Sequence, residues 1–130
     1  MITLTDYWMG RDREFPLALT PQIEKNAALT VQLANALLVR FGEGRKVNSG
    51  WRSPEVNAKT TGAAPNSKHM TGQAIDLSDP DGDLDDWLMS PDGQAAMTEL
   101  GLWHEHPAAT KGWAHLQTVP PRSGRRTFYP

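Results

Sequence analysis

Two histidines and one aspartate are the residues of this chain that could do chemistry together. His69 lies seven positions before Asp76, and His115 follows later in the short run Trp-Ala-His-Leu-Gln. Two imidazole nitrogens and a carboxylate oxygen suit Zn²⁺, and three protein ligands leave one coordination position open. An ion with an open position activates water for attack on a carbonyl carbon. The three residues therefore predict a catalytic metal site, provided that the fold brings them together.

The alternative is an ordinary role for each histidine, because a lone histidine is most often a surface residue or a hydrogen-bonded core residue. The surroundings of His69 favour the metal site. A strand over 73–78 would put Asp76 on the same face as Ala74, whose small side chain leaves space there. Gly72 allows the backbone to pass close to a ligand. On residue chemistry alone, both interpretations stay open.

The overall composition is that of an ordinary soluble globular protein. The 130 residues are 38% hydrophobic and 22% charged, with a formal net charge of −2. This charge predicts no nucleic-acid or membrane-surface partner, and no apolar stretch approaches the ~20 residues of a membrane span. The chain has no cysteine, which excludes disulfides, thiol catalysis and Cys-ligated zinc. We therefore expect one domain over 1–130, a monomer in which any metal is held by histidine and carboxylate.

Short helices and strands must position these residues. Thr20 and Pro21 predict a helix start, apolar residues continue at helical spacing to Phe41, and Gly42 suits the left-handed end of the helix. Further helices are expected over 54–59 and from 91 to the glycine at 101, and strands within 47–54, over 73–78, over 102–105 and over 113–119. Residues 1–19 would form an N-terminal arm and 120–130 an irregular basic tail. This pattern predicts an α+β domain with a small, mainly antiparallel sheet packed with helices.

Three short motifs follow one another between residues 49 and 117. They are Ser49-Gly50-Trp51-Arg52-Ser53, the ten-residue pattern Ser67-x-His69-x-x-Gly72-x-Ala74-x-Asp76, and Trp113-Ala114-His115. Together they resemble the zinc D-Ala-D-Ala carboxypeptidase family, which includes phage and bacterial peptidoglycan L,D-endopeptidases and shares its fold with the hedgehog signalling domain. The ten-residue pattern is specific, whereas Trp-x-His alone would be weak. The resemblance implies a hedgehog/DD-peptidase-like fold and a Zn²⁺ ion held by His69, Asp76 and His115.

The resemblance also implies roles for residues around the metal. Arg52 would bind a substrate carboxylate or stabilise the oxyanion, and its alternative is a surface ion pair with Glu55. Ser67 would position the substrate, although its hydroxyl could equally bond the loop backbone. Trp113 would line the cleft on the same strand face as His115.

The general base is where the chain departs from better-known members of the family. Many of them carry Glu or Asp three residues before the last histidine ligand, and here that position is Gly112. The nearest carboxylate belongs to Glu105. If residues 102–105 pair with residues 113–117, Glu105 can take a proton from the attacking water and return it to the leaving amine. The alternative is a solvated side chain at a strand end. The neighbouring His104 would donate a hydrogen bond to the tetrahedral intermediate, or else be an exposed loop residue.

The function predicted on this basis is a zinc metallopeptidase that hydrolyses an amide bond in peptidoglycan stem peptides. It would be a carboxypeptidase or an endopeptidase. The N-terminus lacks the pattern of a signal peptide, so we expect a phage lysin, or a cell-wall remodelling enzyme held in the cytoplasm until released, that acts at the wall or in the periplasm. The alternative, which Gly112 keeps open, is a non-catalytic wall-binding or virion structural module that retains the scaffold. A metal hydrolase of phosphoesters is a third interpretation.

Overall fold

The longest helix, α3, begins and ends as its sequence predicts. In the computed structural model, which describes residues 1–130, α3 spans Pro21–Phe41. The Thr20 side chain accepts a hydrogen bond from the backbone N–H of Ile23 at 3.2 Å, and Pro21 occupies the first helical turn. Gly42 follows with a φ of 92°, a left-handed conformation that suits glycine. The apolar face of the helix is buried in the core through Ala27, Val31, Ala34, Leu37 and Leu38.

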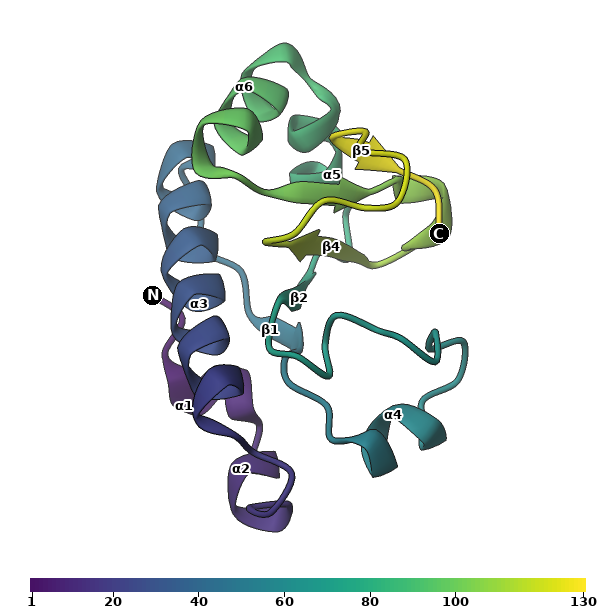
Figure 1. The fold of residues 1–130 in the computed structure, drawn as a ribbon. Helices are drawn as coiled ribbons and strands as arrows, with labels where there is room; N and C mark the ends of the chain where they lie inside the picture. The colour runs from purple at the N-terminus through teal and green to yellow at the C-terminus, as the bar shows by residue number, and fades with distance from the viewer.

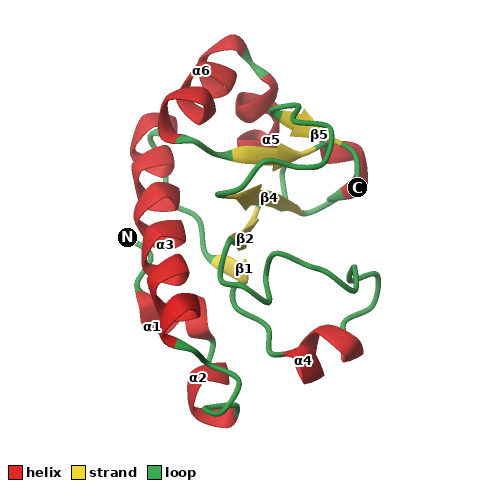
Figure 2. Cartoon of the chain, viewed as in Figure 1, coloured by secondary structure: helices red, strands yellow, loops and turns green.

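One open five-stranded sheet lies beside α3 (Figure 1). The strands stand in the order β1 (Val47–Ser49), β2 (Ala74–Ser78), β4 (Trp113–Gln117), β3 (Trp103–Glu105) and β5 (Thr127–Phe128), as Figure 2 shows in yellow. All neighbouring strands are antiparallel except β3 and β5, which are parallel. The predicted α+β class with a small, mainly antiparallel sheet is therefore confirmed.

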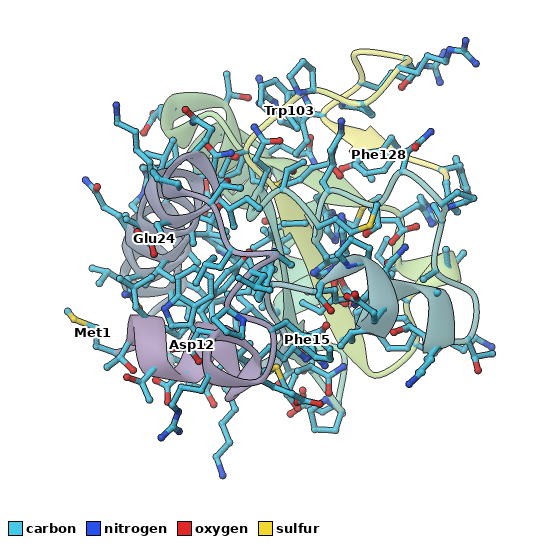
Figure 3. All side chains as sticks on the ribbon, turned by 60° about the horizontal axis from the view of Figure 1, so that its bottom comes forward. Met1, Asp12, Phe15, Glu24, Trp103 and Phe128 are labelled. Carbon is cyan, nitrogen blue, oxygen red and sulfur yellow. The ribbon has the colours of Figure 1, made fainter.

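The two faces of the sheet have different surroundings. Successive residues of a strand point to opposite faces, so Ile75 and Leu77 of β2 face one side while Ala74 and Asp76 face the other. Ile75 and Leu77 belong to the hydrophobic core, together with residues of α3, α5 (Asp83–Met89) and α6 (Pro91–Leu100). Side chains fill the space between these helices and the sheet (Figure 3). The helices thus cover the Ile75 face, and the Asp76 face is left for polar groups.

The shorter elements lie at the ends of the chain and between the strands. The N-terminal arm contains α1 (Leu4–Trp8) and α2 (Arg11–Glu14), α4 spans Pro54–Lys59, and a 3-10 helix, η1, spans Pro107–Ala109. The helices α4 and α6 confirm those expected over 54–59 and from 91 to 101. No helix combines the length and the apolar character that crossing a bilayer would require.

The C-terminal tail differs from its prediction. Residues 120–130 were expected to be irregular, but β5 adds to the edge of β3 as a short strand (Figure 1). The backbone carbonyl of Arg126 accepts a hydrogen bond from the N–H of His104 at 2.8 Å, and that of Phe128 accepts one from the N–H of His106 at 2.7 Å. Two residues are too few for a visible alternation of apolar and polar side chains, so only the tertiary pairing reveals this strand.

Candidate metal centre

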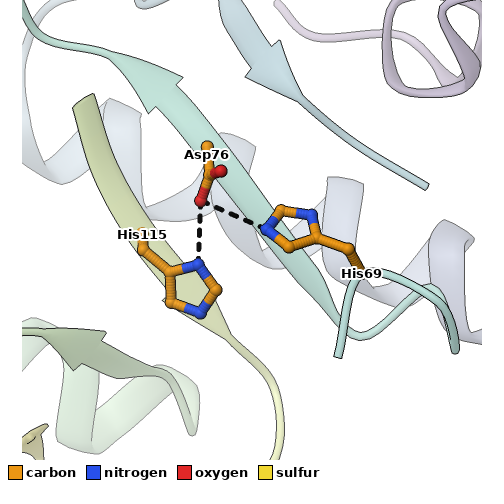
Figure 4. Close-up of side chains that lie close together, drawn as sticks. All are labelled: His69, Asp76 and His115. Atoms are coloured by element: carbon orange, nitrogen blue, oxygen red, sulfur yellow. Dashed lines mark hydrogen bonds and ion pairs between the residues drawn. The ribbon is translucent and has the colours of Figure 1, made fainter. Parts of the chain in front are cut away.

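His69, Asp76 and His115 converge on one point of the polar face of the sheet (Figure 4). Asp76 and His115 face each other across the antiparallel pair of β2 and β4. Asp76 Oδ1 lies 2.8 Å from His115 Nδ1 and 3.3 Å from His69 Nε2. Two ligands of a tetrahedral zinc ion with bonds of 2.0–2.1 Å lie roughly 3.3–3.4 Å apart. The two pairs that include Asp76 are therefore close to the separation of zinc ligands, and all three ligand atoms lie within 4.8 Å of one another.

The loop that carries His69 is tied to the Ser49–Ser53 motif by three hydrogen bonds. The N–H of Arg52 donates to the carbonyl of His69 at 3.1 Å, and the indole N–H of Trp51 donates to the carbonyl of Met70 at 3.0 Å. His69 Nδ1 lies 2.8 Å from the carbonyl oxygen of Gly50. Because a carbonyl can only accept, Nδ1 carries the proton, and the lone pair of Nε2 points toward Asp76. Two of the predicted motifs thus fold as one unit.

Tyr7 of the N-terminal arm contacts the backbone next to the metal site at two points. A Cβ atom added at Gly50 would lie 2.0 Å from the backbone oxygen of Tyr7, so only glycine fits at this contact. The Tyr7 hydroxyl donates to the carbonyl of Ala74 at 2.8 Å. Burial raises the pKa of Tyr7 well above its ordinary value, which keeps the phenol protonated as a donor. The arm therefore fixes the backbone on both sides of the site.

Gly72 lies against the backbone of α3. It has a φ of 76°, and a Cβ atom there would lie 2.9 Å from the backbone oxygen of Ile23 in α3. The close approach that the structure shows at Gly72 is therefore to this helix.

Arg52 lies against the carboxylate of the cluster. Its Nε donates to Ser49 Oγ at 3.1 Å, and Nη2 lies 3.5 Å from Asp76 Oδ2. The side chain is buried, whereas Glu55 is exposed and forms no ion pair with it, so the surface alternative does not apply. Burial acts to raise the pKa of Asp76, but its close contacts with the imidazoles of His115 and His69 outweigh this and hold the pKa below the ordinary range. Asp76 is therefore an anion between three nitrogen-bearing side chains.

Glu105 lies on the same face of the sheet, one strand further on. In the pairing of β3 with β4, Trp103 faces Gln117 and His104 faces Leu116. Continuing this antiparallel register by one residue sets Glu105 opposite His115, and residues opposite each other project to the same face. Glu105 is half-buried, and this burial raises its pKa above the ordinary value.

His104 points the other way and lies in the core. Its side chain is fully buried, and its Nε2 lies 2.8 Å from Asp85 Oδ1 of α5. Because alternate residues of β3 face opposite sides, His104 cannot share a face with Glu105. This geometry excludes the expected contact of His104 with the tetrahedral intermediate, and it excludes the exposed-loop alternative as well.

Two other expected cleft residues lie close to the metal ligands. The Ser67 hydroxyl accepts a hydrogen bond from the N–H of His69 at 3.2 Å, which matches the backbone alternative. That bond leaves the hydroxyl proton free. Trp113 is half-buried on β4, two residues before His115 and hence on the same face.

The structure adds two residues that sequence reasoning missed. Gln117 Oε1 lies 3.1 Å from His115 Nε2, and the ring of Phe128 packs edge-on against His115 with 6.3 Å between centroids. The strand expected over 113–119 carried a signal for Gln117, because a residue two positions from His115 shares its face. Phe128 had no such signal, since β5 was not predicted.

Comparison with known proteins gave one match. A family model described as Peptidase M15 matches residues 13–106, which is more than two thirds of the chain. The matched region includes His69, Asp76 and Glu105, and it ends before His115. Searches of curated proteins and of solved structures found no match.

Proposed function

The chain belongs to the peptidase M15 family, and from this premise we propose that it is a zinc-dependent peptidase that hydrolyses an amide bond in peptidoglycan stem peptides. The observation that carries the proposal is the convergence of His69, Asp76 and His115 within 4.8 Å of one another, with Glu105 on the same face of the next strand. Neutral imidazoles and one carboxylate are the donors of a catalytic zinc site that keeps an open position. Bound zinc acidifies a coordinated water and polarises the scissile carbonyl.

Glu105 is the general base in this proposal. Its position opposite His115 supports the role, because a carboxylate there is next to the ligands yet belongs to a different strand. It would take the proton from the attacking water and deliver it to the leaving amine. Gly112, the position where many family members carry the base, is an exposed residue with a φ of 95°. The base has thus moved to β3 in this interpretation.

Arg52 stabilises the negative charge that develops on the carbonyl oxygen. Its Nε and Nη2 are engaged with Ser49 and Asp76, while Nη1 makes no hydrogen bond within the protein. A buried guanidinium with one unengaged donor nitrogen, held beside the metal ligands, suits an oxyanion or a substrate carboxylate. Ser67 would offer its free hydroxyl proton to a substrate carbonyl, and Trp113 would line the cleft.

The proposed setting is the bacterial cell wall. We expect a monomer that acts there on stem peptides, as a phage lysin or a wall-remodelling enzyme. The second candidate is a non-catalytic wall-binding or virion module, and the specific observation that favours it is the missing carboxylate at Gly112.

The test is hydrolysis of purified peptidoglycan. Zinc-loaded protein should release new amino groups, and the His69→Ala variant should not. Masses of the released fragments would identify the bond, because loss of one D-alanine indicates a carboxypeptidase and a broken cross-link or stem indicates an endopeptidase. Intact peptidoglycan after treatment with protein of measured zinc content would exclude the enzyme and leave the binding module.

A further inference from the structure

Gln117 is a buried amide in direct contact with a proposed metal ligand. It is 6% exposed and lies on β4, two residues after His115 and on the same face. Its Oε1 is 3.1 Å from His115 Nε2, and its Nε2 donates to the backbone carbonyl of Val119 at 2.9 Å. Both ends of the amide are therefore engaged, one of them with the imidazole.

The Val119 carbonyl decides which way the amide points. The oxygen and nitrogen of a glutamine are nearly alike in shape, so the orientation must come from its partners. A backbone carbonyl has no proton to give, so the NH₂ group must face Val119 and the oxygen must face His115. An amide oxygen can only accept, which means that His115 Nε2 carries a proton.

Both ring nitrogens of His115 face an acceptor in the metal-free protein, and without Gln117 a neutral ring would carry its single proton on Nδ1. Asp76 Oδ1 lies 2.8 Å from His115 Nδ1, and a carboxylate at that distance attracts a proton strongly. With no partner for an N–H at Nε2, a neutral imidazole would keep its single proton on Nδ1, between the ring and Asp76. That nitrogen is the one that faces His69 and would have to bind the metal.

We infer that Gln117 is a positioning residue that holds His115 with its proton on Nε2, so that Nδ1 is the atom that binds the metal. The inference rests on the proposed metal site. It also makes the two histidines unlike each other. His69 binds through Nε2 because the Gly50 carbonyl holds its Nδ1 proton, whereas His115 binds through Nδ1 because a side chain holds its Nε2 proton.

The first test needs no variant. Long-range ¹H–¹⁵N correlation spectra of zinc-loaded protein report which nitrogen of each imidazole carries the proton. The expected result is a proton on Nε2 of His115 and on Nδ1 of His69. A proton on Nδ1 of His115, with the metal on Nε2, would overturn the inference.

The second test measures zinc affinity by competition with a chromophoric chelator. Gln117→Leu removes the acceptor and should weaken zinc binding about 10–100-fold, while Gln117→Glu keeps an acceptor for Nε2 but loses the donor to Val119 and should recover only part of the affinity. Gln32→Leu is the matched control, because Gln32 is an exposed glutamine of α3 whose amide makes no hydrogen bond within the protein, and it should leave the zinc affinity unchanged. Wild-type affinity in Gln117→Leu, or an equal loss in the Gln32 variant, would contradict the role.

Both tests are made with zinc alone, so they separate this inference from the proposed function. A protein with the expected protonation that leaves peptidoglycan intact would refute the peptidase and keep the role of Gln117. Hydrolysis of peptidoglycan by a protein whose His115 binds zinc through Nε2 would support the peptidase and refute the role of Gln117.

Discussion

Asp76 and His115 face each other across β2 and β4, with Asp76 Oδ1 2.8 Å from His115 Nδ1. The next strand, β3, extends this row of facing residues, because its register with β4 sets Glu105 opposite His115. One face of three adjacent strands therefore carries a carboxylate and an imidazole of the proposed metal site and, on the third strand, a second carboxylate.

Glu105→Gln should separate metal binding from turnover. The amide keeps the shape of the side chain but cannot accept the proton of the attacking water, so kcat should fall about 10²–10⁴-fold. Zinc content and affinity should match the wild type, since Glu105 is not a ligand. The rate is measured on peptidoglycan and the metal by elemental analysis. If the Glu105→Gln enzyme is active, Glu105 is not the general base, and another group, for example in the loop before β4, must take the proton.

The same substitution should stabilise the metal-free protein at neutral pH. Burial raises the folded-state pKa of Glu105, so the folded protein favours the protonated form and ionisation costs stability. The cost is absent below the unfolded pKa, near 4.5, and is complete above the folded pKa. Glu105→Gln should therefore raise the free energy of unfolding at pH 7 by less than ~1 kcal/mol, because the group is half-exposed, and should have no effect near pH 4. Urea titrations at the two pH values measure this difference, and a stabilisation that is equal at both would contradict the cause.

Arg52→Lys should be nearly as harmful as Arg52→Ala. A lysine keeps the charge but cannot reach Ser49 Oγ and Asp76 Oδ2 at once while leaving a donor for the substrate. We expect kcat/KM to fall about 10²–10³-fold in both variants, the cost of losing one oxyanion donor. Arg13→Ala, an exposed arginine of α2, is the control and should leave the rate unchanged. Full activity in Arg52→Lys would mean that the charge alone is sufficient.

The parts of the fold that sequence reasoning could predict are those fixed by local signals. The helix over 21–41 has a threonine cap, a proline in its first turn and a glycine at its end, and these act within a few residues. The strand with Ala74 and Asp76 on one face follows from alternation alone. The convergence of His69, Asp76 and His115 is not local, and only the motifs shared with a known family predicted it.

The parts that failed depend on contacts between distant segments. The space for a side chain at Gly72 is taken by α3, which no pattern around residue 72 reveals. The strand β5 is formed by its parallel pairing with β3, which lies more than twenty residues earlier in the chain. His104 is a different case, because the sequence did contain the answer. A strand that turns Glu105 to the face of His115 must turn His104 to the opposite face, so both could not serve the same cleft.

Gly50→Ala should lower both the stability of the protein and its affinity for zinc, although Gly50 is not a proposed ligand. A Cβ atom there would lie 2.0 Å from the Tyr7 backbone oxygen, so either the arm or the Gly50 carbonyl must move. We expect a loss of about 1–3 kcal/mol in the free energy of unfolding, as for other overpacked sites. Because the displaced carbonyl also holds the Nδ1 proton of His69, zinc affinity should fall about 10–100-fold. Gly44→Ala, where the added atom meets nothing within 4 Å, is the control for both measurements. A variant that loses stability but keeps its zinc affinity would show that the arm moves and the carbonyl stays, and the orientation of His69 would then not depend on this contact.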